Sequence, residues 1–149
     1  MINLAEALSW IPPEYRGRTL RPYYTPITTA AAIGVGGAAD LTTPLQNVAA
    51  FLLMEIVGRV YTVAAPDVSV PDPSLTAWVR FSSGDDLTNG AMPWAAIIGS
   101  LTNPNAGSGG LVAPRLVSGG SIITVSAASY GATAYLVRLS FGGINIFNT

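Results

Sequence analysis

Residues 133–141 read Thr-Ala-Tyr-Leu-Val-Arg-Leu-Ser-Phe and alternate between two sets of side chains. One face of an extended chain carries Tyr135, Val137, Leu139 and Phe141, while Leu136 falls on the other face. The residues between them, which include Arg138 and Ser140, share the opposite face. The segment Leu75–Phe81 repeats this alternation, with Thr76, Trp78 and Arg80 on its more polar face. A period of two predicts β-strands that bury one face, so the sequence indicates an all-β protein.

Turn residues separate these strands from their neighbours. Gly142-Gly143 predicts a turn into a further strand at Ile144–Phe147, and Ser118–Ser121 predicts a turn into a strand at Ile122–Ser126. The chain holds 16 glycines and 11 prolines in 149 residues, the length of one ordinary domain. Short strands with regular turns are typical of sandwiches and barrels. Over residues 27–149 we therefore predict one antiparallel β-domain, either a sandwich or a barrel.

The strongest apolar segment is Asn47–Val63. Its Phe51–Val57 portion is apolar at nearly every position, which suits a buried strand or a helix equally well. The alternation of Arg59-Val60-Tyr61-Thr62-Val63 after Gly58 favours strands, with a bend or bulge at the glycine.

Residues 1–26 differ from the rest and are predicted to form an extended N-terminal arm. Asn3–Ser9 suits one or two helical turns with Leu4 and Leu8 on one face, and four prolines then enforce an extended path. The arm carries most of the candidate protein-interface residues: Trp10, Tyr15, Arg16, Arg18, Arg21, Tyr23 and Tyr24. The arm is expected to dock on its own domain or on a partner chain. Since Arg and Tyr are enriched at interfaces, we favour a partner and expect the sandwich to fold without the arm.

The composition excludes most enzyme classes. The chain has no His, no Cys and no Lys, and its net charge is −1 with only 10% charged residues. Serine–histidine catalysis, Schiff bases, P-loops and the common zinc, haem and iron–sulfur sites all need a missing residue. We therefore predict no enzymatic activity, no cofactor and no metal. We also expect neither nucleic acid nor a membrane as a partner, because the chain is not basic and its uncharged stretches are broken by proline and glycine.

Two further tryptophans, Trp78 and Trp94, are candidate interface residues; core packing and glycan stacking are the alternatives. Asp85-Asp86, near Ser82, Ser83 and Asn89, could bind calcium, but a solvated hairpin turn is the favoured interpretation. Asp67 and Asp72 could act as an acid–base pair, but turn aspartates commonly bond their own backbone.

Five segments together resemble small jelly-roll virion proteins of tailed bacteriophages, of the head decoration or cement type. They are residues 51–58, 75–81, 93–99, 114–122 and 134–147. The resemblance covers residues 27–149, and it implies an antiparallel β-sandwich of the jelly-roll type with an extended terminal arm. It also implies a non-enzymatic protein present in many copies in the virion. It transfers no catalytic residue.

The expected function is therefore a structural one: stabilising a capsid through contacts with the major capsid protein or other virion subunits. The low charge and the need to cover edge strands predict a homo-oligomer. A trimer is implied by the resemblance alone. The alternative function is a receptor- or glycan-binding head of a phage spike or tail fibre.

Overall fold

The computed structural model describes residues 4–28, 32–45, 48–70, 73–84, 86–88, 90–98 and 110–149. Several of the sequence interpretations fall on residues outside these ranges. They concern Asp72, Asp85, Asn89 and the loop predicted at Asn103–Gly110, of which only Gly110 is described.

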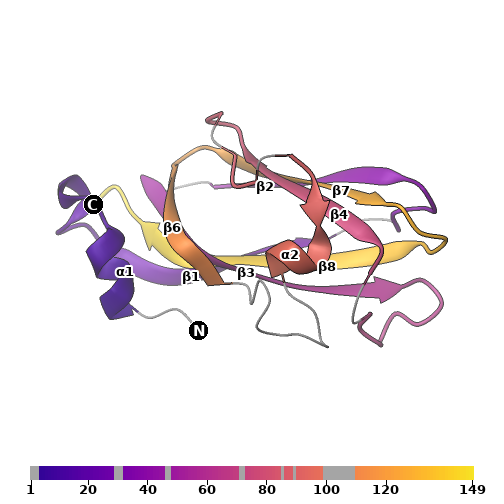
Figure 1. The fold of residues 1–149 in the computed structure, drawn as a ribbon. Helices are drawn as coiled ribbons and strands as arrows, with labels where there is room; N and C mark the ends of the chain where they lie inside the picture. The colour runs from indigo at the N-terminus through magenta and orange to yellow at the C-terminus, as the bar shows by residue number, and fades with distance from the viewer. Residues whose placement is uncertain are drawn as a thin grey trace.

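Eight strands and three short helices make up the described chain (Figure 1). The helical elements are α1 (Leu4–Trp10), the 3-10 helix η1 (Pro13–Tyr15) and α2 (Trp94–Ile98). The strands are β1 (Leu20–Thr28), β2 (Ala38–Pro44), β3 (Ala50–Thr62), β4 (Leu75–Phe81), β5 (Met92–Pro93), β6 (Gly110–Ser118), β7 (Ile122–Ser129) and β8 (Tyr135–Ile146).

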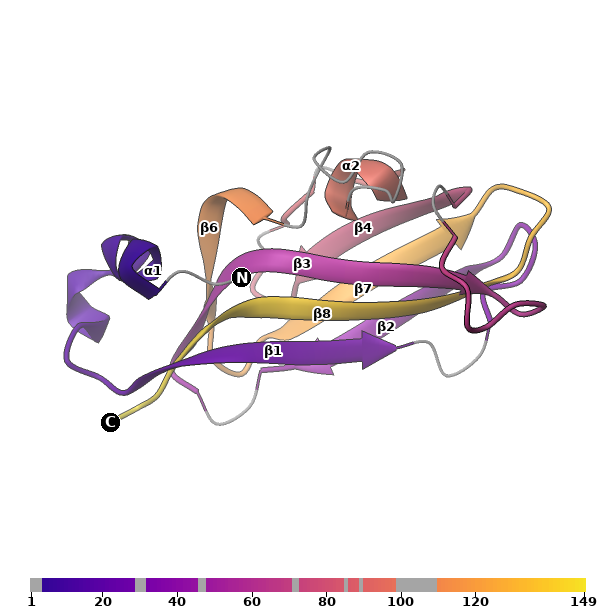
Figure 2. The same cartoon turned by 90° about the horizontal axis from the view of Figure 1, so that it is seen from below.

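The strands form two packed antiparallel sheets, which confirms the predicted all-β sandwich (Figures 1 and 2). One sheet has the order β1-β8-β3-β6 and the other β2-β7-β4-β5. The hydrogen-bonded pairs therefore include β1 with β8, β2 with β7, β3 with β6 and β4 with β5. A long antiparallel ribbon rolled up between two sheets gives this pairing, which is the jelly-roll.

Both alternating segments bury the face that the sequence predicts. In β4 and β8 the side chains of Leu75, Val79, Val137 and Phe141 lie in the core between the sheets. Neighbouring strands contribute the other members of this core, for example Ile56 and Val125.

The apolar run in β3 is a strand that is buried on both faces. Phe51 and Leu53 belong to the core between the sheets, whereas Ala50 and Leu52 belong to a second cluster on the outer face. The predicted bulge is present, but it lies at Met54, between the register positions of Leu53 and Glu55, and not at Gly58. One extra residue there shifts the alternation, so that Ile56 and Val60 also face the core.

Gly58 lies within the continuous strand and permits a close contact. A Cβ at this position would lie 2.6 Å from Leu139 Cδ2 and 3.0 Å from Trp94 Cζ2. The glycine is therefore explained by tight packing against α2 and β8 rather than by a bend.

The predicted turn at Gly142-Gly143 is wrong, because β8 runs unbroken through both residues to Ile146. The two glycines lie opposite the β3 bulge, where side chains and the β3 backbone crowd the strand. A Cβ at Gly142 would lie 2.6 Å from the Tyr24 ring, and one at Gly143 would overlap the Leu52 carbonyl oxygen. Glycine here makes room for neighbours and does not reverse the chain.

Residues 20–28 are a strand of the sandwich, and the predicted boundary between residues 26 and 27 falls inside it. β1 pairs with β8 over its whole length, from Leu20 opposite Ile146 to Thr28 opposite Arg138. The extended path that the prolines impose is thus used in a sheet of the same chain.

The helix α1 lies against the outer face at one end of the β1-β8-β3-β6 sheet (Figure 2). The predicted helix is present, but Ala7 is buried and Leu8 is exposed. The side chain of Leu4, the other residue of the predicted face, lies outside the described part of the structure. Ala7 and the following Ile11 pack on Leu52, Ile144 and their neighbours. No helix in the described part of the chain is long and apolar enough to cross a membrane.

Candidate functional site

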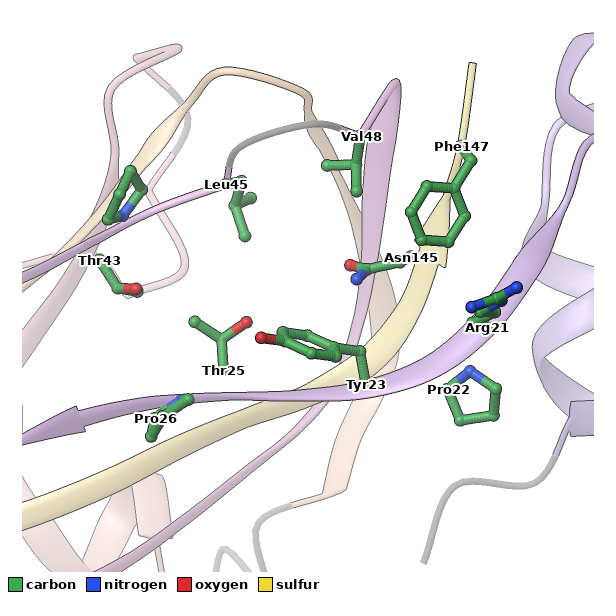
Figure 3. A pocket seen from close by; sticks show the side chains of 11 residues that line it. Arg21, Pro22, Tyr23, Thr25, Pro26, Thr43, Leu45, Val48, Asn145 and Phe147 are labelled. Atoms are coloured by element: carbon green, nitrogen blue, oxygen red, sulfur yellow. The ribbon is translucent and has the colours of Figure 1, made fainter. Parts of the chain in front are cut away.

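A groove lies between the two edge strands β1 and β2, where the sheets separate at one side of the sandwich (Figure 3). Its volume is about 650 Å³. The described residues that line it come from three segments: Arg21, Pro22, Tyr23, Thr25, Pro26, Thr43, Pro44, Leu45, Val48, Asn145 and Phe147. Arg21 is the one ionisable cation of this lining, so the groove is mainly aromatic, aliphatic and hydroxylic.

The alternation of β1 places its residues on two sides. Thr25 and Ile27 are buried between the sheets, so Arg21 and Tyr23, which share their parity, also point to that side. The Tyr23 ring lies along the groove towards Thr25, while Phe147 and Arg21 lie at the other end (Figure 3). The Arg21 guanidinium lies 5.8 Å from the centre of the Phe147 ring, a cation–π distance.

Tyr24 points to the opposite, outer face of β1. Its hydroxyl donates a hydrogen bond to Glu55 Oε1 across the strand β8. This hydrogen bond, with lesser contributions from burial and from the Glu55 charge, raises the pKa of Tyr24 above its ordinary value of 10.0. The pair fixes the tyrosine ring over Gly142 but leaves it 43% exposed.

The other predicted residues of the arm gather around α1 and η1. Trp10, at the end of α1, is 45% exposed, whereas Tyr15 packs partly against the cluster under the helix. The Arg18 guanidinium lies 5.2 Å from the centre of the Tyr15 ring. Arg16 is exposed and ends the 3-10 helix.

Trp94, predicted as an interface residue, is a core residue with 3% exposure. The prediction failed because Trp94 begins the short helix α2, which turns its ring inward over Gly58.

Trp78 lies on the outer face of the other sheet, with the Arg80 guanidinium 4.5 Å from its ring centre. Arg80 also contacts Asp40 at 3.8 Å, and both bond the Ser126 hydroxyl. The predicted interface residues are therefore divided among separate places rather than collected in one site.

Of the carboxylates that the sequence singled out, only Asp67 and Asp86 lie in the described residues, so neither proposed pair is described in full. No group of three or more His, Cys, Asp or Glu side chains that could hold a metal ion is found among the described residues. Asp86 forms an isolated bridge with Arg80, and Asp67 lies exposed in a turn.

Of the groove lining, sequence reasoning singled out only Arg21 and Tyr23, and the residues that it missed include Asn145 and Phe147. Their alternation with Ile144 and Ile146 could have predicted them, because it places both side chains on the same face of the strand. They were missed because the turn predicted at Gly142-Gly143 assigned residues 144–147 to a separate strand, whereas Asn145 belongs to β8 and Phe147 follows it directly.

Comparisons with models of known protein families and with curated proteins find no match for this chain.

Proposed function

We propose that this chain is a structural virion protein of the capsid decoration or cement type, which stabilises its particle by contacts between proteins. The observation that carries the proposal is the exposure of three large aromatic side chains, one at the end of α1 and two at adjacent positions of the edge strand β1, where they point to its two sides. Trp10, Tyr23 and Tyr24 are 45%, 49% and 43% exposed. Aromatic rings of this size bury a large apolar area when covered, so they are typical anchors of protein interfaces.

The edges of the sheets support association through side chains rather than through strand pairing. Proline occurs in each of the four edge strands and in none of the four central strands: Pro22, Pro26, Pro44, Pro93 and Pro114. A proline cannot donate a backbone hydrogen bond, so it weakens a free edge as a template for another strand. A subunit of this kind would meet its neighbours through the exposed aromatic side chains.

We infer a homo-oligomer, with a trimer as the expected state, that contacts the major capsid protein or another virion subunit. The test is sedimentation equilibrium at micromolar concentration, with wild type and the triple variant W10S/Y23S/Y24S. The triple variant V35S/V63S/V68S is a matched control, since it also removes three exposed apolar side chains but on loops elsewhere.

Wild type and the valine variant should associate, and the aromatic variant should be monomeric with an unchanged circular dichroism spectrum. A monomeric wild type, or equal loss in both variants, would contradict this interface. The location is tested by mass spectrometry and electron microscopy of particles produced from the genome that encodes the chain. The protein should be present in many copies at symmetry-related positions, and its absence would refute the virion role.

A receptor- or glycan-binding head is the second candidate, and the groove favours it. Tyr23 offers an aromatic face, and Thr25, Thr43 and Asn145 offer hydroxyl and amide groups beside it. A glycan array with wild type and Y23A distinguishes the two functions. Specific glycan binding that Y23A abolishes would favour the receptor head, and no binding would favour the cement protein.

A further inference from the structure

Two arginines lie directly opposite each other on the outer face of the β1-β8-β3-β6 sheet. Arg59 of β3 and Arg138 of β8 are register partners in the antiparallel ladder. Both side chains are exposed. Each arginine directly precedes a core residue, Val60 or Leu139, so both side chains point to the outer face. This part of the sheet lies beyond the end that α1 covers, and β1, β8 and β3 are in front in Figure 2.

Like charges in directly opposed positions are unfavourable, since their Cβ atoms are about 5 Å apart. Neither guanidinium forms an ion pair with a carboxylate of the described residues. Arg59 Nη1 donates a hydrogen bond to its neighbour, the Gly58 carbonyl oxygen, at 3.2 Å. The Arg138 guanidinium lies 4.9 Å from the centre of the Tyr61 ring. Glu55, the acidic residue on this face of β3, lies four residues before Arg59 along the strand. Its carboxylate accepts a hydrogen bond from the Tyr24 hydroxyl.

The two arginines border a shallow hollow of about 380 Å³. Ser140, one row along β8, contributes a hydroxyl to its lining, and Pro26, Val57 and Tyr61 contribute apolar surface. The hollow thus combines two cations, a hydroxyl and an aromatic ring on rigid strands. Guanidinium groups are well suited to carboxylate, sulfate and phosphate, because their N–H groups match pairs of oxygens.

We propose that the hollow bordered by Arg59, Arg138 and Ser140 is a binding site for an oxyanion group, a carboxylate or a sulfate, on a small ligand. The anion relieves the repulsion between the opposed guanidiniums and accepts charge-assisted hydrogen bonds from both. The apolar lining provides contact area for the carrier of the group. This inference does not depend on the proposed structural function.

The test is an NMR titration of the ¹⁵N-labelled full chain with sodium sulfate and, separately, with sodium glucuronate, at constant ionic strength set by sodium chloride. The first probe is the bare anion, and the second carries a carboxylate on a sugar. We expect saturable amide shifts around Arg59, Tyr61, Arg138 and Ser140 with at least one of the probes. Saturation by glucuronate at lower concentration than by sulfate would show that the carrier contributes to binding.

The variants R59Q and R138Q should each weaken binding tenfold or more. The control is R18Q, which makes the same change of charge and also removes an arginine from a tyrosine ring, but outside the sheet. Circular dichroism and thermal unfolding show that each variant is folded, and R59Q should be no less stable than wild type. Shifts that do not saturate with either probe, or equal weakening by R18Q, would overturn the proposal.

Discussion

Gly58 shows how one residue can have a role that its type does not reveal. Glycine in a strand suggests a bend, yet here it lies in regular β3 so that the Trp94 ring and the Leu139 side chain can approach the backbone. The same contact explains why Trp94 is buried. Its ring fills the space that a side chain at position 58 would occupy.

The substitution G58A should therefore destabilise the protein by about 1–3 kcal/mol, the usual cost of overpacking a core. G34A is the control, because a Cβ there has nothing within 4 Å and the residue has no positive φ. Its effect should stay within about 0.5 kcal/mol. Urea unfolding measures both, and an equal effect of the two substitutions would refute the packing explanation.

The Tyr24–Glu55 pair gives a pH-dependent prediction. Because the folded pKa of Tyr24 is raised, the neutral phenol is favoured in the folded state. The stabilisation is complete below the unfolded pKa near 10 and is lost as the pH rises through the higher folded value. In ultraviolet difference titrations of wild type against Y24F, Tyr24 should ionise above pH 10, and E55Q should bring its pKa down. An unchanged titration in E55Q would contradict the hydrogen bond.

At the scale of elements, the prolines divide the strands into two classes. Central strands must donate backbone hydrogen bonds on both sides, and none contains proline. In β1, Pro22 and Pro26 lie opposite Ile144 and Ser140 of β8 without disturbing the register. A proline whose backbone nitrogen faces the free edge removes no hydrogen bond between the two strands. The prolines that suggested an extended arm are thus compatible with an edge strand.

Restoring the backbone N–H groups at positions 22 and 26 should allow the edge strand β1 to pair with strands of other molecules. We expect P22T/P26T to remain folded and to form larger, β-rich aggregates at concentrations where wild type keeps its native size. P12T makes the same change outside any strand and should behave as wild type. Light scattering and thioflavin fluorescence measure the difference. No change in the double variant would mean that another feature protects this edge.

At the scale of the whole molecule, the first strand pairs with the last. β1 lies beside β8, and α1 packs on Ile144 and Ile146 near the end of the described chain. The sheet therefore closes only after both ends of the chain have met. Long-range pairing of this kind makes folding slow, because the entropy of closing the loop is lost before the contacts form.

We accordingly expect folding in about milliseconds to seconds, in a single cooperative transition, as measured by stopped-flow fluorescence. Deleting residues 1–25 should abolish that transition, because it removes most of β1 and uncovers β8. This expectation reverses the one drawn from the sequence, in which the sandwich folds without its arm. A deletion variant that still unfolds cooperatively would support the sequence-based interpretation.

The sequence alone determined the class of the fold and much of its core. The alternation in Leu75–Phe81 and residues 133–141 identified the buried faces of β4 and β8, because a strand buried on one face shows its period directly. It also placed aromatic and arginine side chains near the N-terminus, of which Trp10, Tyr23 and Tyr24 are exposed.

Only the tertiary structure decided the rest, because these features depend on partners far apart in the chain. The continuous apolar run of β3 reflects burial under α1 on one face and in the core on the other, which no local period reveals. The roles of Gly58, Gly142 and Gly143 depend on which side-chain and backbone atoms of distant segments approach them. The groove between β1 and β2, and the opposition of Arg59 and Arg138, exist because the jelly-roll brings distant segments side by side.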